Sequence, residues 1–128
     1  FDRLEKINSI RRDNALRLLN LLSNFDFIQF PEISPQAEPV FLRLPFIVDR
    51  KEIGTHLFIS MRSKGIGISK YYFRTLPDMY VNLVDSNPRY YPGANHISRC
   101  LYTLPTHAYL QENDFEIILN TFRNVSKY

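Results

Sequence analysis

Residues 40–73 read VFLRLPFIVDRKEIGTHLFISMRSKGIGISKYYF, and this stretch decides the fold. Apolar side chains alternate along residues 40–48, which predicts a β-strand because successive side chains of a strand point to opposite faces. Pro45 has no backbone N–H, so the strand should lie at a sheet edge or carry a bulge. The side chains that would share one face of this strand are Val40, Leu42, Leu44, Phe46 and Val48.

A helix should follow over residues 50–64, where Ile53, Leu57 and Met61 recur at four-residue steps. Asp49 and Glu52 have the spacing of a capping box at its start, and Gly65 stands where a left-handed residue would end it. Residues 66–73 alternate again and predict a second strand. Glycines followed by Ser and Lys also occur in phosphate loops. Such a loop leads into a helix, whereas here a helix leads into the glycines, so a helix stop explains them better.

The flanking segments complete an alternation of helices and strands. Residues 2–24 contain no Pro or Gly and predict a long amphipathic helix, whereas residues 25–39 hold three prolines and predict a loop. Residues 74–93 read as a long loop with a polar cluster at residues 85–87. A short helix (94–99), a short strand (100–104) and a closing helix (111–126) follow. We therefore expect an α+β fold: a small, mainly antiparallel three-stranded sheet with helices packed on one face, a two-layer sandwich.

Composition excludes several classes of protein. The chain has 128 residues, 45% of them hydrophobic, which suits one folded domain over residues 1–128 and excludes overall disorder. A net charge of +3 and a single cysteine give no sign of a dedicated nucleic-acid binder or of a disulfide-stapled scaffold. No apolar run is long enough to cross a bilayer, so we expect no membrane partner. The single cysteine favours a reducing compartment, and we expect a cytoplasmic location.

Two groups of residues are candidates for chemistry. His96 and Cys100 are four residues apart and would share a helix face, with His107 as a possible third metal ligand. One cysteine and loose spacing favour a buried small hydrophobe instead, so we predict neither a metal site nor a Cys–His nucleophile. Lys70, Tyr71 and Tyr72 end the predicted second strand, where a cation and two phenol hydroxyls could reach a substrate carboxylate, phosphate or sugar hydroxyl. Tyrosines half-packed on the core are the structural alternative.

Four pieces of the sequence occur in a telling order and together span nearly the whole chain. They are Arg12-x-Asn14-Ala15, Phe41-Leu42-Arg43-Leu44-Pro45, the turn from Gly65 to Tyr72, and Tyr91-Pro92-Gly93-Ala94 leading to Leu104-Pro105-Thr106-His107 with Asp114 beyond. In this order they resemble the C-terminal small domain of DegT/StrS-type pyridoxal-phosphate (PLP)-dependent nucleotide-sugar aminotransferases. The sequence departs from the family at Ala108 and Phe73, where Pro is common.

The resemblance implies a parent enzyme that moves an amino group from a donor onto a keto sugar carried on a nucleotide. In the family, the Schiff-base lysine and the cofactor-binding residues belong to a large N-terminal domain, which we expect to lie outside these 128 residues. This chain would then be catalytically silent alone, bind no PLP, and cover the cleft of its own large domain within a homodimer. Tyr72 is the first candidate to contact substrate, with Lys70 and Tyr71 beside it. Asn14, Ala15 and the Leu104-Pro105 segment would serve packing.

Two other classes of function remain open. A stand-alone binding or regulatory domain could use the same fold without the catalytic half, because fold does not fix function. A nucleic-acid module could use the cations of the first helix, Arg3, Lys6, Arg11, Arg12 and Arg17, although such charges are usually only its solvated face.

Overall fold

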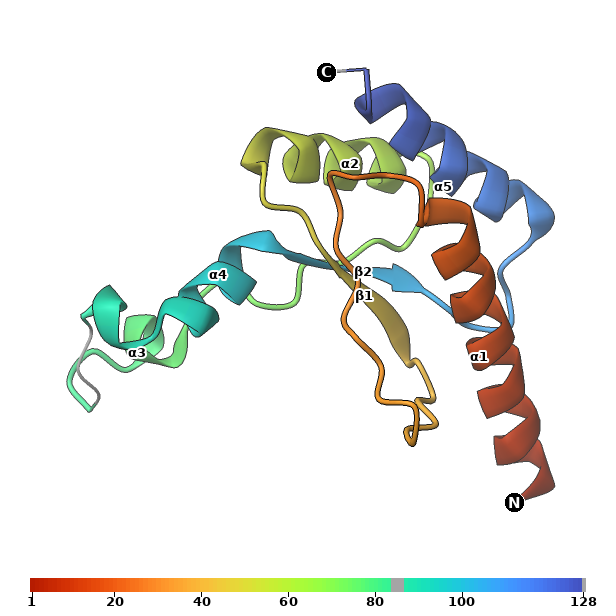
Figure 1. The fold of residues 1–128 in the computed structure, drawn as a ribbon, viewed down its shortest axis with the longest axis horizontal. Coiled ribbons are helices and arrows are strands. Elements are labelled where there is room, and N and C mark those ends of the chain that lie inside the picture. Colours follow the sequence, from red (N-terminus) through yellow and green to blue (C-terminus); the bar gives the residue numbers. More distant parts are fainter. Residues whose placement is uncertain (84–86, 128) are drawn as a thin grey trace.

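The computed structural model describes residues 1–83 and 87–127, and Figure 1 shows its arrangement. Helices and strands both occur, so the α+β class is confirmed. Along the chain the elements are α1 (Asp2–Leu22), β1 (Arg43–Ile47), α2 (Lys51–Ser63), α3 (Leu76–Met79), the 3-10 turn η1 (Pro88–Tyr90), α4 (Pro92–Cys100), β2 (Leu101–Pro105) and α5 (Glu112–Val125).

The sheet within the described residues has two strands, and the expectation of three is wrong. β1 and β2 pair antiparallel, with Phe46 opposite Tyr102. The predicted strand at residues 66–73 contributes only an isolated bridge, in which Ser69 and Thr103 exchange backbone hydrogen bonds of 3.0 and 2.8 Å. The cause lies in β2. Leu101 already donates its N–H to the carbonyl of Ile97, and Pro105 has no N–H, so only Thr103 can donate along this edge.

β1 is also shorter than the predicted strand of residues 40–48. Phe41 has φ 53°, a left-handed conformation that turns the chain just before the strand. The hydroxyl of Thr106 donates to the carbonyl oxygens of Phe41 (2.5 Å) and Leu42 (3.1 Å) and holds this turn. Val40 and Leu42 are therefore exposed, whereas Leu44, Phe46 and Val48 are buried.

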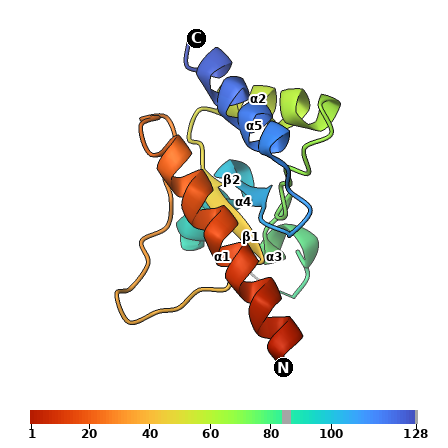
Figure 2. The ribbon, with the colours of Figure 1, turned by 90° about the vertical axis from the view of Figure 1, so that its right-hand side faces the viewer.

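The core fills the space between one face of the sheet and three helices. In Figure 2, α1 crosses in front of the sheet, with α2 and α5 above it. Each helix supplies an apolar stripe at three- and four-residue steps, which is why these sequences form amphipathic helices. Three rings pack around Phe46, with centroids 5.7–6.5 Å from its own: Phe30, Tyr102 and Phe122. The buried helical residues include Ala15, Leu18, Leu22, Ile53, Leu57, Met61, Phe115, Ile118, Phe122 and Val125.

The helix ends follow the sequence only in part. Gly65 has φ +81° and ends α2 as predicted, because glycine adopts this region without steric cost. The expected capping box at Asp49 and Glu52 is wrong. Arg50 is the N-cap of α2, and no side chain caps it. Capping boxes form instead at Thr75 with Asp78, before α3, and at Gln111 with Asp114, before α5.

Residues 71–83 and 87–100 form what we call the α3/α4 arm, which lies to one side of the sheet in Figure 1. The predicted long loop of residues 74–93 contains α3 and η1 within it, and α4 starts at Pro92 rather than at residue 94. Positions 85 and 86 of the predicted polar cluster lie outside the described residues. No helix among residues 1–83 and 87–127 is long and apolar enough to cross a membrane.

Candidate functional site

Arg43 fixes the turn that carries the predicted site residues. Its guanidinium donates to the carbonyl of Gly67, and its Nε donates to the hydroxyl of Thr103 at 2.7 Å. The guanidinium carbon also lies 5.9 Å from the ring centroid of Tyr71. Burial lowers the pKa of Arg43 from its ordinary value, with the nearby Tyr71 acting in the opposite direction. Arg43 therefore ties β1 to the segment that runs from Gly67 to Tyr72.

Lys70, Tyr71 and Tyr72 follow directly after the Ser69 bridge. The ammonium of Lys70 lies 5.5 Å from the ring centroid of Tyr102, within the range of a cation–π contact. The rings of Tyr71 and Tyr72 are 6.5 Å apart and tilted, and both side chains are more than half exposed. Neither tyrosine belongs to the core cluster or to the partly buried residues packed against it. Their role in substrate contact stays a prediction.

Lys70 and Tyr72 face different cavities. Lys70 lines a polar cavity of about 610 Å³ at the start of α2 and along α4. Tyr72 lines a mainly apolar cavity of about 480 Å³ between α3 and α4. Ser98 of α4 lines both, so the two cavities lie on either side of it. The residues of the polar cavity are Asp49, Lys51, Lys70, Phe73, His96, Ser98, Arg99 and Cys100.

The N-cap of α3 lies in the wall of the apolar cavity, because Thr75 is both the N-cap residue and a lining residue. The side chain of Asp78 accepts hydrogen bonds from the Thr75 backbone N–H (2.9 Å) and hydroxyl (2.7 Å). These bonds, that of the hydroxyl first, lower the pKa of Asp78. Thr75 and Leu76 then reach the cavity wall beside Tyr72, with Met79 and Ile97 completing its apolar part. Such a cavity suits an apolar or aromatic group better than a charged one.

The structure brings together only some of the residues that the sequence analysis considered as metal ligands and set aside. His96 and Cys100 do share a face of α4, but Asp49 stands beside them, and His107 is not in this cluster. One donor atom each from Asp49, His96 and Cys100 lies within 4.8 Å of the others. The imidazole ring of His107 instead lies 6.0 Å from the ring of Tyr109, centroid to centroid. The backbone carbonyl of His107 accepts a hydrogen bond from the side-chain amide of Asn14.

Three of the five helix cations considered for nucleic-acid binding already have partners. Arg11 donates to the carbonyl of Leu42 at 2.8 Å, and Arg12 lies 3.6 Å from the carboxylate of Glu38. Arg17 makes a two-pronged bond to Glu112 at 2.6 and 2.5 Å. These contacts tie α1 to neighbouring segments, which weakens the nucleic-acid alternative.

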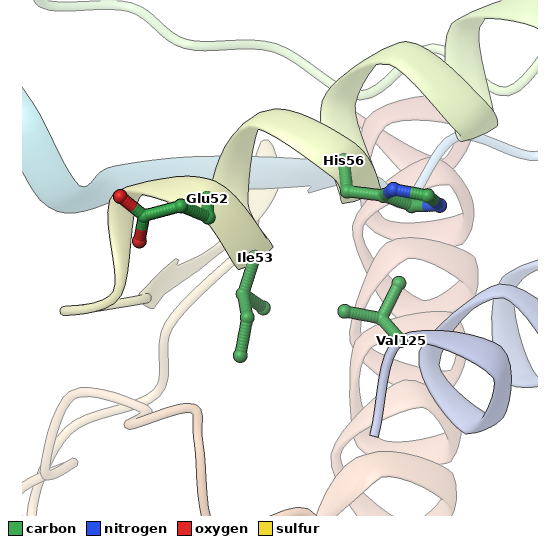
Figure 3. A pocket seen from close by; sticks show the side chains of 4 residues that line it. All are labelled: Glu52, Ile53, His56 and Val125. Carbon is green, nitrogen blue, oxygen red and sulfur yellow. The ribbon is translucent and has the colours of Figure 1, made fainter. Parts of the chain in front are cut away.

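A further cavity of about 280 Å³ lies between α2 and α5 (Figure 3). Ile53 and Val125 line it from the two helices, and His56 lies at its edge. The carboxylate of Glu52 extends away from His56, so the acid and the base are not aimed at a common point. We read this cavity as a gap between two packed helices.

The lysines of this chain do not fit a PLP site. A lysine that forms a Schiff base is normally desolvated, which keeps its amine neutral and reactive. Here Lys6, Lys51, Lys64 and Lys127 are exposed, and Lys70 is half-buried with its ammonium over a tyrosine ring. Among the described residues, the buried polar side chains are threonines and Ser98, with no carboxylate to pair with a pyridine nitrogen.

The match to a family model decides the family. Residues 1–123 match the DegT/DnrJ/EryC1/StrS aminotransferase family. The chain belongs to this family. The DegT-family chain spans only about a third of the length of the solved structures that it resembles. No curated protein matches it.

Solved structures share the fold of this DegT-family chain. S. venezuelae DesV in complex with a ketimine intermediate has a TM-score of 0.81 and 21% identity, and the match covers 99% of this chain and 34% of DesV. The Streptococcus pneumoniae protein Spr1654 in its PLP form has a TM-score of 0.81 and 23% identity. The match covers 98% of this chain and 33% of Spr1654. The sugar aminotransferase CalS13 from Micromonospora echinospora has a TM-score of 0.72 and 17% identity. The match covers 96% of this chain and 32% of CalS13.

Sequence reasoning missed Arg43 and Asp49 as members of the site. Arg43 sits in an otherwise apolar strand, and an arginine in that position is a signal for a buried polar contact. Asp49 was assigned to a helix cap, which hid its proximity to α4. Nothing local in the sequence brings Asp49 to His96, because 47 positions separate them along the chain.

Proposed function

We propose that this DegT-family chain is the C-terminal small domain of a PLP-dependent aminotransferase that acts on a nucleotide-linked keto sugar. The large N-terminal domain would lie outside these residues, supply the cofactor and its lysine, and receive this chain over its cleft. A homodimer in the cytoplasm is part of the same proposal. Family membership supports it, as does the coverage of only about a third of each solved relative.

The observation that carries the proposal is the apolar surface of the α3/α4 arm. Large hydrophobic side chains are rarely exposed in a contiguous group on a monomeric protein, and such groups commonly mark interaction surfaces. A second domain would cover much of this arm and leave its cavities at the boundary between the two. The exposed residues are Tyr71, Tyr72, Phe73, Leu76, Met79, Tyr80, Val81, Leu83, Tyr90 and Ile97.

Within that boundary we assign substrate contacts to Tyr72, Lys70 and Tyr71. Tyr72 lines the apolar cavity and carries a hydroxyl for a sugar or base hydrogen bond. Lys70 lines the polar cavity together with Lys51 and Arg99, which gives that cavity three cations suited to an anionic group such as a diphosphate. Arg43 acts as a positioning residue, because it holds the backbone that presents them.

The intact mass and absorbance of the natural gene product test the domain assignment. We expect a polypeptide about three times as long as this chain, given the coverage of its solved relatives. Its purified form should be yellow from the cofactor aldimine. A colourless product of 128 residues would contradict the enzyme assignment and favour the stand-alone binding domain.

Tyr72→Phe in the parent enzyme tests the substrate contact. Loss of one hydrogen bond should lower kcat/KM by about 3- to 10-fold. Tyr109→Phe is the matched control, because Tyr109 is exposed on the connection between β2 and α5, away from both cavities. Equal kinetics for Tyr72→Phe and the parent enzyme would remove Tyr72 from the site.

A further inference from the structure

A cluster of three different metal-binding side chains lies at the start of α2 and along α4. Donor atoms of Asp49, His96 and Cys100 are all within 4.8 Å of one another, and His96 Nε2 is 3.3 Å from Asp49 Oδ1. We propose that these three residues bind a divalent metal ion of the zinc type. The three residues line the polar cavity in which we place an anionic group of the substrate, but binding of the ion does not require transamination.

The backbone fixes the three residues relative to one another. His96 and Cys100 are one helical turn apart on α4, so their side chains lie one above the other. The N–H of Val48 donates to the carbonyl of Cys100 at 3.0 Å, which continues the β1–β2 ladder by one pair beyond Ile47 and Leu101. Asp49 is the next residue after this bond. The carboxylate therefore reaches the α4 pair from a segment that is already anchored.

The donor set selects the class of metal. A thiolate, an imidazole and a carboxylate together suit Zn²⁺ and its spectroscopic substitute Co²⁺, whereas Mg²⁺ and Ca²⁺ prefer oxygen donors. Bond lengths of about 2.0–2.3 Å would bring the three donors somewhat closer together than they now lie. Asp49 and His96 are exposed and Cys100 is half-buried, so small side-chain rotations suffice.

The surroundings allow a fourth ligand and tolerate the charge. The polar cavity of about 610 Å³ opens beside the cluster, so water or a ligand atom can complete a tetrahedral site. The thiol of Cys100 loses its proton to solvent as the metal–sulfur bond forms. Thiolate and carboxylate then balance the two positive charges of the ion. Lys51, Lys70 and Arg99 line the same cavity. Lys51 and Arg99 are exposed, so solvent and salt screen their repulsion of the ion. The ammonium of the half-buried Lys70 lies over the ring of Tyr102, whose π face offsets part of its charge.

Titration of this chain with Co²⁺ under reducing conditions tests the proposal. We expect one ion per chain, a near-ultraviolet thiolate-to-cobalt band, and visible bands of four-coordinate Co²⁺ that Zn²⁺ abolishes by displacement. Cys100→Ser should remove the thiolate band. His96→Ala and Asp49→Asn should each weaken Co²⁺ binding by about 10-fold or more.

His56→Ala is the matched control, because His56 is an exposed histidine on α2 that does not belong to the cluster. It should bind Co²⁺ as the unchanged chain does. Circular dichroism of each variant checks that it is folded. A folded chain that shows no thiolate band would overturn the proposal. So would equal loss of affinity in His56→Ala and His96→Ala, since that result indicates only scattered surface histidine binding.

Discussion

The helical body and the α3/α4 arm use apolar residues in opposite ways. The body is formed by α1, α2, α5 and the sheet. Its large apolar side chains pack against one another, and Phe46 is 0% exposed. In the arm, the large side chains face outward, and Phe73 is 74% exposed. Burial of apolar area stabilises the folded state only where water is excluded. The body therefore accounts for most of the stability of the chain, whereas the arm leaves large apolar side chains exposed.

A matched pair of phenylalanine truncations is the most direct way to break this comparison. Phe46→Ala should cost about 3–5 kcal/mol of unfolding free energy, because it leaves a cavity among Phe30, Tyr102 and Phe122. Phe73→Ala should change it by about 0.5 kcal/mol or less. Urea unfolding followed by circular dichroism measures both. A similar cost for the two variants would show that the arm belongs to the same cooperative core.

Two glycines sharpen the comparison further. A Cβ at Gly54 of α2 would lie 2.6–2.8 Å from the ring and hydroxyl of Tyr102, whereas a Cβ at Gly93 of α4 would meet nothing within 4 Å. Gly54→Ala should therefore destabilise the chain by about 1–3 kcal/mol, despite the better helix propensity of alanine. Gly93→Ala should be neutral or stabilise by up to about 1 kcal/mol. Thermal and urea unfolding measure the free energy of unfolding of both variants. If Gly54→Ala did not lower it, the close packing of α2 on β2 would be contradicted.

The smallest effect that we expect concerns one carboxylate in the body and one in the arm, each with a lowered pKa. A hydrogen bond from Arg17 lowers the pKa of Glu112 in the body, and Thr75 lowers that of Asp78 in the arm. A lowered folded-state pKa gives stability that is full above the ordinary carboxyl pKa of about 4 and is lost as pH falls through the folded value. Arg17→Met should raise the pKa of Glu112 and leave that of Asp78 unchanged, while Thr75→Val should do the reverse.

Carbon-13 NMR titration of the carboxyl groups reads each pKa separately. Unfolding at pH 7 and pH 3 adds the linked stability, which should depend less on pH in Arg17→Met than in the unchanged chain. If one variant shifted the pKa of both Glu112 and Asp78, the arm and the body would be electrostatically coupled.

The sequence predicts the body better than the sheet. α1, α2 and α5 each carry a long apolar periodicity, and all three form close to their predicted bounds. The third strand failed for a non-local reason. Alternation in residues 66–73 is a local signal, but pairing depended on which donors of β2 remained free, and Leu101 and Pro105 offer none on that edge. The capping box at Asp49 failed similarly, because the spacing alone does not show where the helix starts.

For the site, the sequence gives residue types but not their neighbours. Lys70, Tyr71 and Tyr72 lie on irregular backbone after the Ser69 bridge, where the tyrosines are exposed and Lys70 is half-buried. Their roles remain predictions. The pairing of His96 with Cys100 follows from helical spacing, whereas the third partner does not. Asp49 comes from across the β1–β2 ladder, and His107 is closer to Cys100 in sequence but is not in the cluster.

Pro45 and Pro105, one in each strand, affect how readily the sheet edges can pair with another polypeptide. Ile47 and Gln29 exchange hydrogen bonds on the outer edge of β1, so the backbone nitrogen of Pro45 points to that same edge and offers no donor there. Pro105 does the same on the opposite edge, beside Ser69. A neighbouring polypeptide therefore finds no continuous row of donors on either side of the sheet. These prolines protect a small β-structure against edge-to-edge aggregation.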